Sequence, residues 1–123
     1  MKIRIKDNSI RLRLTKTDIK NLKEHQLISC KTVISGSETF KYELQSGADL
    51  DKISVKFSQG TIVVTIPINQ AKILIDTDEI TIKGTQDNGT EEPLFILIEK
   101  DLECLDATDE DQSDMFENKK SVC

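Results

Sequence analysis

Basic side chains crowd the start of the chain with a spacing that suits anion binding. Residues 1–16 carry six Lys or Arg side chains and a single acid, Asp7. A two-residue turn at Asp7-Asn8 would place Arg4 opposite Arg11 and Lys2 opposite Arg13. Adjacent guanidinium groups can hold a phosphate or a carboxylate through bidentate hydrogen bonds. The residues that this spacing predicts to form a basic face are Lys2, Arg4, Arg11 and Arg13.

Three interpretations of this face are open. Like charges directly across a strand pair cost up to roughly 1 kcal/mol, so the side chains splay apart in solvent, are neutralised within the protein, or bind a partner. Neutralisation would come from Glu43 and Glu99 on neighbouring strands, or from the acidic end of the chain folding back. A partner would be an acidic protein segment or a small anion. Nucleic acid is disfavoured, because the chain has no tryptophan and a net charge of −5.

The other reactive residue types do not form a recognisable site. Cys30, Cys104 and Cys123 are odd in number and widely spaced, which favours reduced thiols in a cytoplasm over disulfides or zinc. Acidic neighbours of Cys104 oppose the formation of a nucleophilic thiolate. The acids of 109–111, with Asp114, lack the turn glycine and closing glutamate of a calcium loop. We therefore predict no catalytic, cofactor-binding or metal-binding residues, and a binding function rather than catalysis.

An internal repeat predicts the elements that position the basic residues. With a shift of 52 residues the apolar pattern of residues 3–30 recurs without a gap, and two extra residues in the next turn extend the match through a second hairpin. We infer two strand-strand-helix-strand-strand units, residues 1–46 and 52–100. The matched pairs include Ile3/Val55, Ile5/Phe57, Ile10/Ile62, Leu12/Val64, Leu14/Ile66, Ile28/Ile80, Cys30/Ile82 and Tyr42/Ile96.

Local signals agree with these units. Asp7-Asn8 and Gln59-Gly60 suit two-residue type I′ turns. Thr15 can cap the first helix with Asp18 in a capping box, and Pro67 is favoured at the first position of the second helix. Both helices should span two or three turns. The second hairpins are expected at Leu27–Ser35 with Glu38–Gln45, and at Glu79–Thr85 with Leu94–Lys100.

The predicted fold is α+β, with about eight mostly antiparallel strands and two short helices in a single domain, residues 1–101. The strands would form a closed or nearly closed barrel, or one strongly curved sheet with both helices on the same side. Residues 102–123 are expected to be an acidic, partly disordered tail. No apolar run approaches the roughly 20 residues of a membrane helix, and no secretory signal is expected.

A barrel with a basic lumen would resemble the triphosphate tunnel enzymes in architecture. Those enzymes carry a metal-binding Glu-x-Glu-x-Lys pattern on the first strand, where this chain has Lys2-x-Arg4-x-Lys6. A divalent metal therefore has no carboxylate anchor at this place, and a hydrolase is disfavoured.

Two stretches resemble the ends of a family of short bacterial proteins of unknown function. They are MKIRIKDNSIRLRLTK at residues 1–16 and FILIEKDLECLD at residues 95–106. Members open with a near-identical basic hairpin, and they close with a Glu-Lys-Asp-x-x-Cys-Leu run and an acidic tail. They end in an aromatic-Pro-Asn sequence, from which Phe116-Glu117-Asn118 departs. The resemblance implies a bacterial, cytoplasmic protein, and no activity comes with it.

Two functional hypotheses follow. The first is a non-enzymatic binding or interaction module, whose basic face contacts an acidic partner such as the tail of the same chain. The alternative is an enzyme or sensor that holds a small phosphorylated or carboxylated ligand in a barrel pocket. An enzyme needs a concave site where the basic face meets an acid or base such as Glu43 or Glu99.

Overall fold

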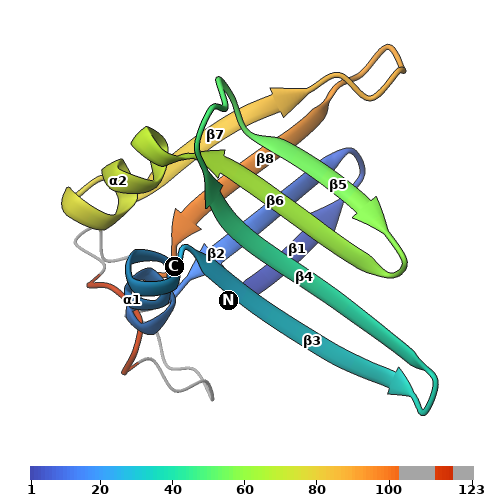
Figure 1. Cartoon of the computed structure of the whole chain (residues 1–123), viewed down its shortest axis with the longest axis horizontal. Coiled ribbons are helices and arrows are strands. Elements are labelled where there is room, and N and C mark those ends of the chain that lie inside the picture. The colour runs from blue at the N-terminus through green and yellow to red at the C-terminus, as the bar shows by residue number, and fades with distance from the viewer. Residues whose placement is uncertain (103–112, 118–123) are drawn as a thin grey trace.

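The computed structural model of the protein describes residues 1–102 and 113–117 (Figure 1). These residues form eight strands and two helices, as predicted. In chain order the elements are β1 (Lys2–Lys6), β2 (Ser9–Leu14), α1 (Lys16–His25), β3 (Leu27–Ser35), β4 (Glu38–Gly47), β5 (Ser54–Ser58), β6 (Thr61–Pro67), α2 (Ile68–Asp76), β7 (Thr81–Gln86) and β8 (Leu94–Lys100).

The strands lie in two four-stranded sheets, each built from both repeat units. Sheet A has the order β1-β2-β8-β7, and sheet B has the order β3-β4-β6-β5. Within each hairpin the pairing is antiparallel, which confirms a mostly antiparallel fold. The hairpins of different units meet through parallel pairs, β2 with β8 and β4 with β6. Each unit therefore contributes one hairpin to sheet A and one to sheet B.

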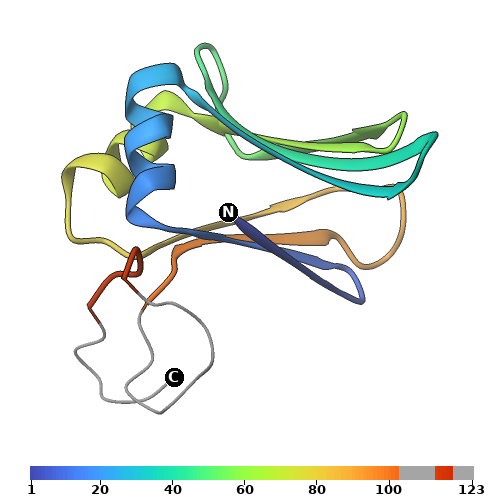
Figure 2. The same ribbon diagram turned by 90° about the horizontal axis from the view of Figure 1, so that it is seen from below.

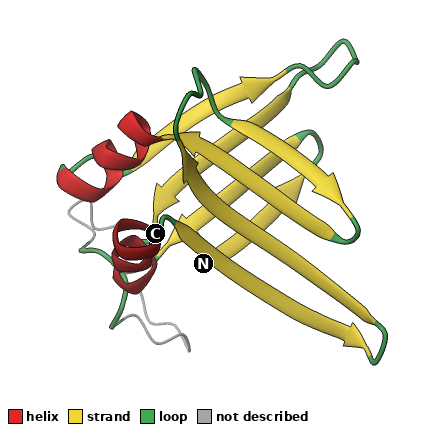
Figure 3. Ribbon diagram, in the orientation of Figure 1, coloured by secondary structure: helices red, strands yellow, loops and turns green. Residues whose placement is uncertain are grey.

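The two sheets do not close into a barrel. They lie face to face with both helices at one end and all four hairpin turns at the other (Figures 2 and 3). Side chains bridge neighbouring sheet edges where a barrel would have backbone pairs. The Gln86 amide exchanges two hydrogen bonds, of 2.7 and 3.0 Å, with the backbone of Val55. On the opposite side, the hydroxyl of Tyr42, on β4 next to the edge strand β3, donates to the Met1 carbonyl at 3.0 Å.

The core lies between the sheets and under the helices. The predicted apolar pattern supplies most of it, and α1 and α2 close the end with Leu22, Ala71 and Leu74. Ile53, in the segment between the units, is 2% exposed and packs on Gly84, where a Cβ would lie 3.3 Å from its Cδ1. Ile5 and Phe57 lie on the predicted inward face but are 55% and 69% exposed, because they sit at the open end.

The repeat is confirmed in its order of elements, but the predicted alignment of the second hairpins is wrong by two residues. Ile98 pairs with Ile82 in sheet A, and its counterpart Leu44 pairs with Ile28 in sheet B. Ile28 therefore corresponds to Ile82 rather than Ile80, and the extra residues lie between α2 and β7. A shift of two residues leaves an alternating pattern unchanged, so the sequence could not distinguish the two alignments.

The local signals at the helix starts and hairpin turns are largely confirmed. The Asp18 amide donates to the Thr15 hydroxyl at 3.2 Å, and the Thr15 amide donates to the Asp18 carboxylate at 2.9 Å. Pro67 is the N-cap of α2 rather than its first residue. Gln59 and Gly60 both have positive φ, as a type I′ turn requires, whereas at the first turn only Asp7 does (φ 50°).

Candidate functional site

The basic face lies on the outside of sheet A, rather than in a lumen. The register of β1 and β2 is the predicted one, with Arg4 opposite Arg11 and Lys2 opposite Arg13. Ile10, Leu12 and Leu14 face inward and are buried, so the basic side chains between them point outward. The parallel pairing with β8 continues these rows, since Arg11 lies beside Leu97 and Arg13 beside Glu99.

Two carboxylates offset part of this charge. Glu99 Oε1 lies 3.0 Å from the Nε of Arg13 and 3.6 Å from the Nε of Arg11, so one carboxylate serves two guanidinium groups. The Lys2 ammonium lies 3.1 Å from the buried Asp101 carboxylate. Within the described residues, Arg4 has no carboxylate at ion-pair distance. The internal neutralisation suggested by the sequence is therefore present through Glu99, and it is partial.

Glu43, the other predicted partner, does not join the basic face. It lies on β4 in sheet B, where it accepts a hydrogen bond of 2.8 Å from the Ser29 hydroxyl. Its inward neighbour Leu44 is fully buried, so Glu43 faces the opposite outside of the molecule. The sequence could not place it, because an alternating pattern specifies the two faces of a strand and not the sheet that the strand enters.

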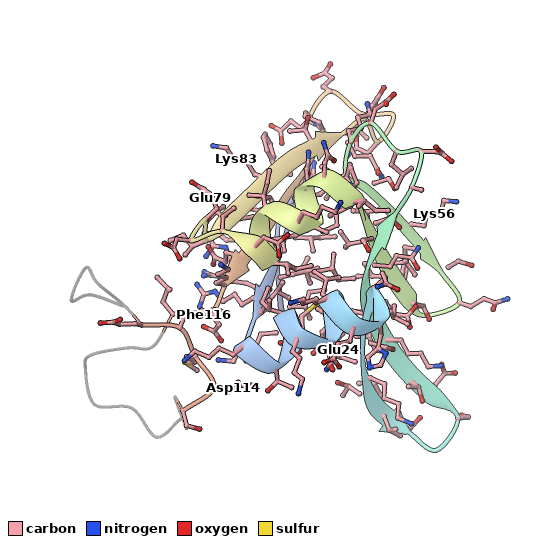
Figure 4. All side chains as sticks on the ribbon, turned by 60° about the vertical axis from the view of Figure 1, so that its left-hand side comes forward. Glu24, Lys56, Glu79, Lys83, Asp114 and Phe116 are labelled. Carbon is pink, nitrogen blue, oxygen red and sulfur yellow. The ribbon has the colours of Figure 1, made fainter. Side chains whose placement is uncertain are left out.

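A groove of about 520 Å³ runs over β2, β8 and β7 beside the basic face. Arg11 and Lys83 stand on its two sides, and Phe95 and Leu97 form the apolar part between them. Figure 4 shows Lys83 projecting away from the core, on the side opposite to Lys56. No carboxylate, histidine or cysteine is among the residues lining the groove. The groove combines positive charge with apolar surface.

The end of the described chain forms a second feature, where the sequence predicted an acidic, partly disordered tail that could fold back on the basic face. Residues 113–117, which we call the docked segment, lie against the start of α1 (Figure 4). The Lys16 amide donates to the Asp114 carbonyl at 3.0 Å, and the Thr17 amide donates to the Asp114 carboxylate at 3.2 Å. Met115 is 7% exposed. These contacts are at the helix terminus and not on the arginines of the basic face.

The docked segment also contacts the end of β8. The Phe116 amide donates to the Asp101 carbonyl at 2.8 Å, and Phe116 forms a parallel bridge with Leu102. The ammonium of buried Lys100 lies 5.3 Å from the centre of the Phe116 ring and donates to the Thr77 carbonyl at 2.9 Å. Lys100 was not predicted to take part in a site, and its only signal in the sequence is a lysine at an inward position of β8.

We expect the Asp114 contact to give a measurable pH dependence. Burial alone would raise the pKa of Asp114, but hydrogen bonds from Thr15 and Thr17 and the charge of Lys16 lower it below its ordinary value. A lowered pKa stabilises the fold above about pH 4, and this contribution disappears as the pH falls through the folded-state value.

Asp114→Asn should therefore unfold with about 0.3–1 kcal/mol less free energy than the parent at pH 6, the range for an acid at a helix N-terminus. The difference should begin to shrink below about pH 4 and vanish once the pH is below the lowered folded-state pKa of Asp114. Denaturant unfolding of both proteins across this pH range measures it. A difference that stays constant as the pH falls below about 4 would assign the effect to a neutral hydrogen bond.

The inner sides of the sheet edges contain a small polar cluster around Met1. Its amine lies 2.8 Å from the Asp18 carboxylate, and its carbonyl accepts from Cys30 as well as from Tyr42. Burial lowers the pKa of this amine, and the hydrogen bond and charge of Asp18 raise it to a net value above its ordinary one. Burial raises the pKa of the Tyr42 hydroxyl, so Tyr42 remains a neutral donor. These contacts hold β1 against sheet B.

Several predicted features are at positions without a described structure. Cys104, Cys123 and the acids of 109–111 lie outside the described residues. Within residues 1–102 and 113–117, no three Cys, His, Asp or Glu side chains converge as metal ligands would. No helix in this part of the chain is long and apolar enough to cross a membrane.

The fold and the site define an α+β protein of two mixed sheets, with a basic and apolar surface on the outside of one sheet. The chain belongs to DUF7009, a family of unknown function whose model matches residues 1–120. This agrees with the resemblance seen at the two ends of the sequence. Comparison with curated proteins and with solved structures gave no match.

Proposed function

We propose that this protein is a non-enzymatic binding module, and that its basic face binds an acidic segment of a protein partner. The supporting observation is a difference between the two halves of a duplicated fold. The outward positions of β5 and β6 that correspond to the basic face are Ser54, Lys56, Val63 and Thr65. Sheet B folds with one cation at these positions, so packing does not require the four cations of sheet A.

The charge arrangement favours a partner over internal pairing. Arg4 lies opposite Arg11, although like charges across a strand pair destabilise the pair. Glu99 is shared between Arg11 and Arg13. Within the described part of the tail, residues 102 and 113–117, no side chain pairs with these arginines. An acidic segment in trans would supply the missing carboxylates through charge-assisted hydrogen bonds.

An enzyme is not favoured by any feature of the groove, whose lining has no carboxylate, histidine or cysteine. The proposal also places the protein in the cytoplasm, on the ground that three widely spaced cysteines suit reduced thiols.

Arg4→Thr tests the proposal, with poly-glutamate as the probe. The variant should bind poly-glutamate about threefold to tenfold more weakly than the parent, and binding by the parent should weaken as salt is added. Removing the cross-strand repulsion should at the same time raise the free energy of unfolding by up to about 1 kcal/mol. Calorimetric titration and denaturant unfolding measure the two effects.

Lys56→Thr is the matched control, because Lys56 occupies the equivalent position in sheet B and the charge change is the same. It should leave poly-glutamate binding within about twofold of the parent, since exposed charges far from the site are screened. An equal loss of poly-glutamate affinity in both variants would show that overall charge, and not the basic face, attracts the peptide. That result, or no binding by the parent, would contradict the proposal.

A further inference from the structure

The groove beside the basic face has an apolar floor that the fold does not need. Phe95 is 53% exposed, and Leu97 is the next outward residue along β8. Their counterparts on the outside of sheet B are Lys41 and Glu43, because β8 and β4 occupy equivalent places in the two sheets. The repeat therefore shows that charged residues suffice at these positions.

The additional apolar and basic residues that sheet A carries, compared with the equivalent positions of sheet B, lie side by side. The parallel pairing of β2 with β8 sets Ser9 beside Phe95 and Arg11 beside Leu97. On the far side of β8, Lys83 lies beside Leu97 and Thr85 beside Phe95. Leu97 thus lies between two cations in the same row. A ligand that fills the groove must present an apolar group between two negative charges.

We infer that the partner is an acidic protein segment that also carries an exposed aliphatic or aromatic side chain, which enters the groove and packs on Phe95 and Leu97. This inference rests on the proposed function and adds the second chemical requirement of the same site. The groove, of about 520 Å³, is large enough for such a side chain. An apolar anchor surrounded by charged contacts is the usual distribution of binding energy in protein interfaces.

The test compares two short peptides, one of glutamates only and one in which a central glutamate is replaced by tryptophan. The protein has no tryptophan, so the fluorescence of the peptide reports directly on the groove. The tryptophan peptide should bind about tenfold more tightly, and its emission should shift to the blue on binding. The double variant Phe95→Thr, Leu97→Thr should remove this tenfold advantage and leave affinity for the all-glutamate peptide within about twofold.

Phe57→Thr is the matched control, since Phe57 is an exposed phenylalanine on β5 of sheet B and does not line the groove. It should keep the tenfold advantage. Comparison of the two peptides on the parent protein needs no variant, so the inference stays testable if the double variant fails to fold. In that case Leu97→Thr alone should reduce the advantage at least threefold.

The remaining outcomes separate the two proposals. Equal affinity for both peptides would overturn the apolar anchor and leave the acidic partner standing. No binding of either peptide would overturn both. Binding to phosphatidylglycerol vesicles in the absence of peptide binding would overturn both in favour of an anionic membrane surface.

Discussion

Residues 1–50 expressed alone are expected to have no stable fold, and residues 51–123 likewise. Each unit places its two hairpins in different sheets, so β1-β2 loses its parallel neighbour β8 and β3-β4 loses its parallel neighbour β6. Isolated two-stranded hairpins are marginally stable in water. The fragments would also expose core residues that are fully buried in the whole protein, such as Leu12, Leu44 and Val64. The stabilising free energy that each fragment loses should exceed the whole stability of a typical domain, about 5–15 kcal/mol.

Mixing the two fragments should restore the fold, because every hairpin then regains its neighbour. Circular dichroism and the dispersion of amide NMR signals should show unfolded spectra for each fragment and a native-like spectrum for the mixture. The matched control is the folded full-length protein cleaved between residues 50 and 51. This cleaved protein should remain folded. A cooperative unfolding transition of fragment 1–50 that does not depend on its concentration would contradict the prediction. A transition that does depend on concentration would indicate that a second copy replaces the missing unit.

Deleting residues 113–123 should lower the free energy of unfolding by about 2–3 kcal/mol. The deletion removes Met115 from a buried position and takes away the contacts of Asp114 with α1 and of Phe116 with Lys100. Burial of one large apolar side chain contributes about 1.5–3 kcal/mol, and a neutral hydrogen bond about 0.5–1.5 kcal/mol. The entropy of ordering the docked segment opposes these terms, so the net effect is smaller than their sum.

Denaturant unfolding of the shortened protein measures this effect. Met115→Ala should account for about half of the loss, whereas Glu117→Gln, at an exposed position of the same segment, should change the stability by less than about 0.5 kcal/mol. Unchanged stability after the deletion would show that the docked segment contributes nothing net. The deletion should leave poly-glutamate binding intact, since the segment lies at the start of α1 and not on Arg4 or Arg11.

Only the basic half of the candidate site could be predicted from the sequence. Alternation and a two-residue turn predicted the register of β1 with β2, and so the stacking of Arg4 on Arg11, because neighbours in a hairpin are neighbours in sequence. Glu99 pairs with the arginines, as predicted, and Glu43 does not. Both residues lie on strands with the same alternating pattern. The apolar half of the groove, Phe95 and Leu97, was not predicted, because neither residue lies near the basic residues in the sequence.

The sequence by itself determined the features that depend on neighbouring residues. These are the class of fold, the duplication, the capping box at Thr15 and Asp18, and the pairing within each hairpin. Only the tertiary structure decided how the hairpins combine, since alternating residues specify which side of a strand is buried but not which strand lies beside it. The parallel joining of β2 to β8 brought Glu99, Phe95 and Leu97 to the basic face. The docking of residues 113–117 on α1 was decided in the same way, by burial of Met115 and by unpaired amides at a helix end far away in sequence.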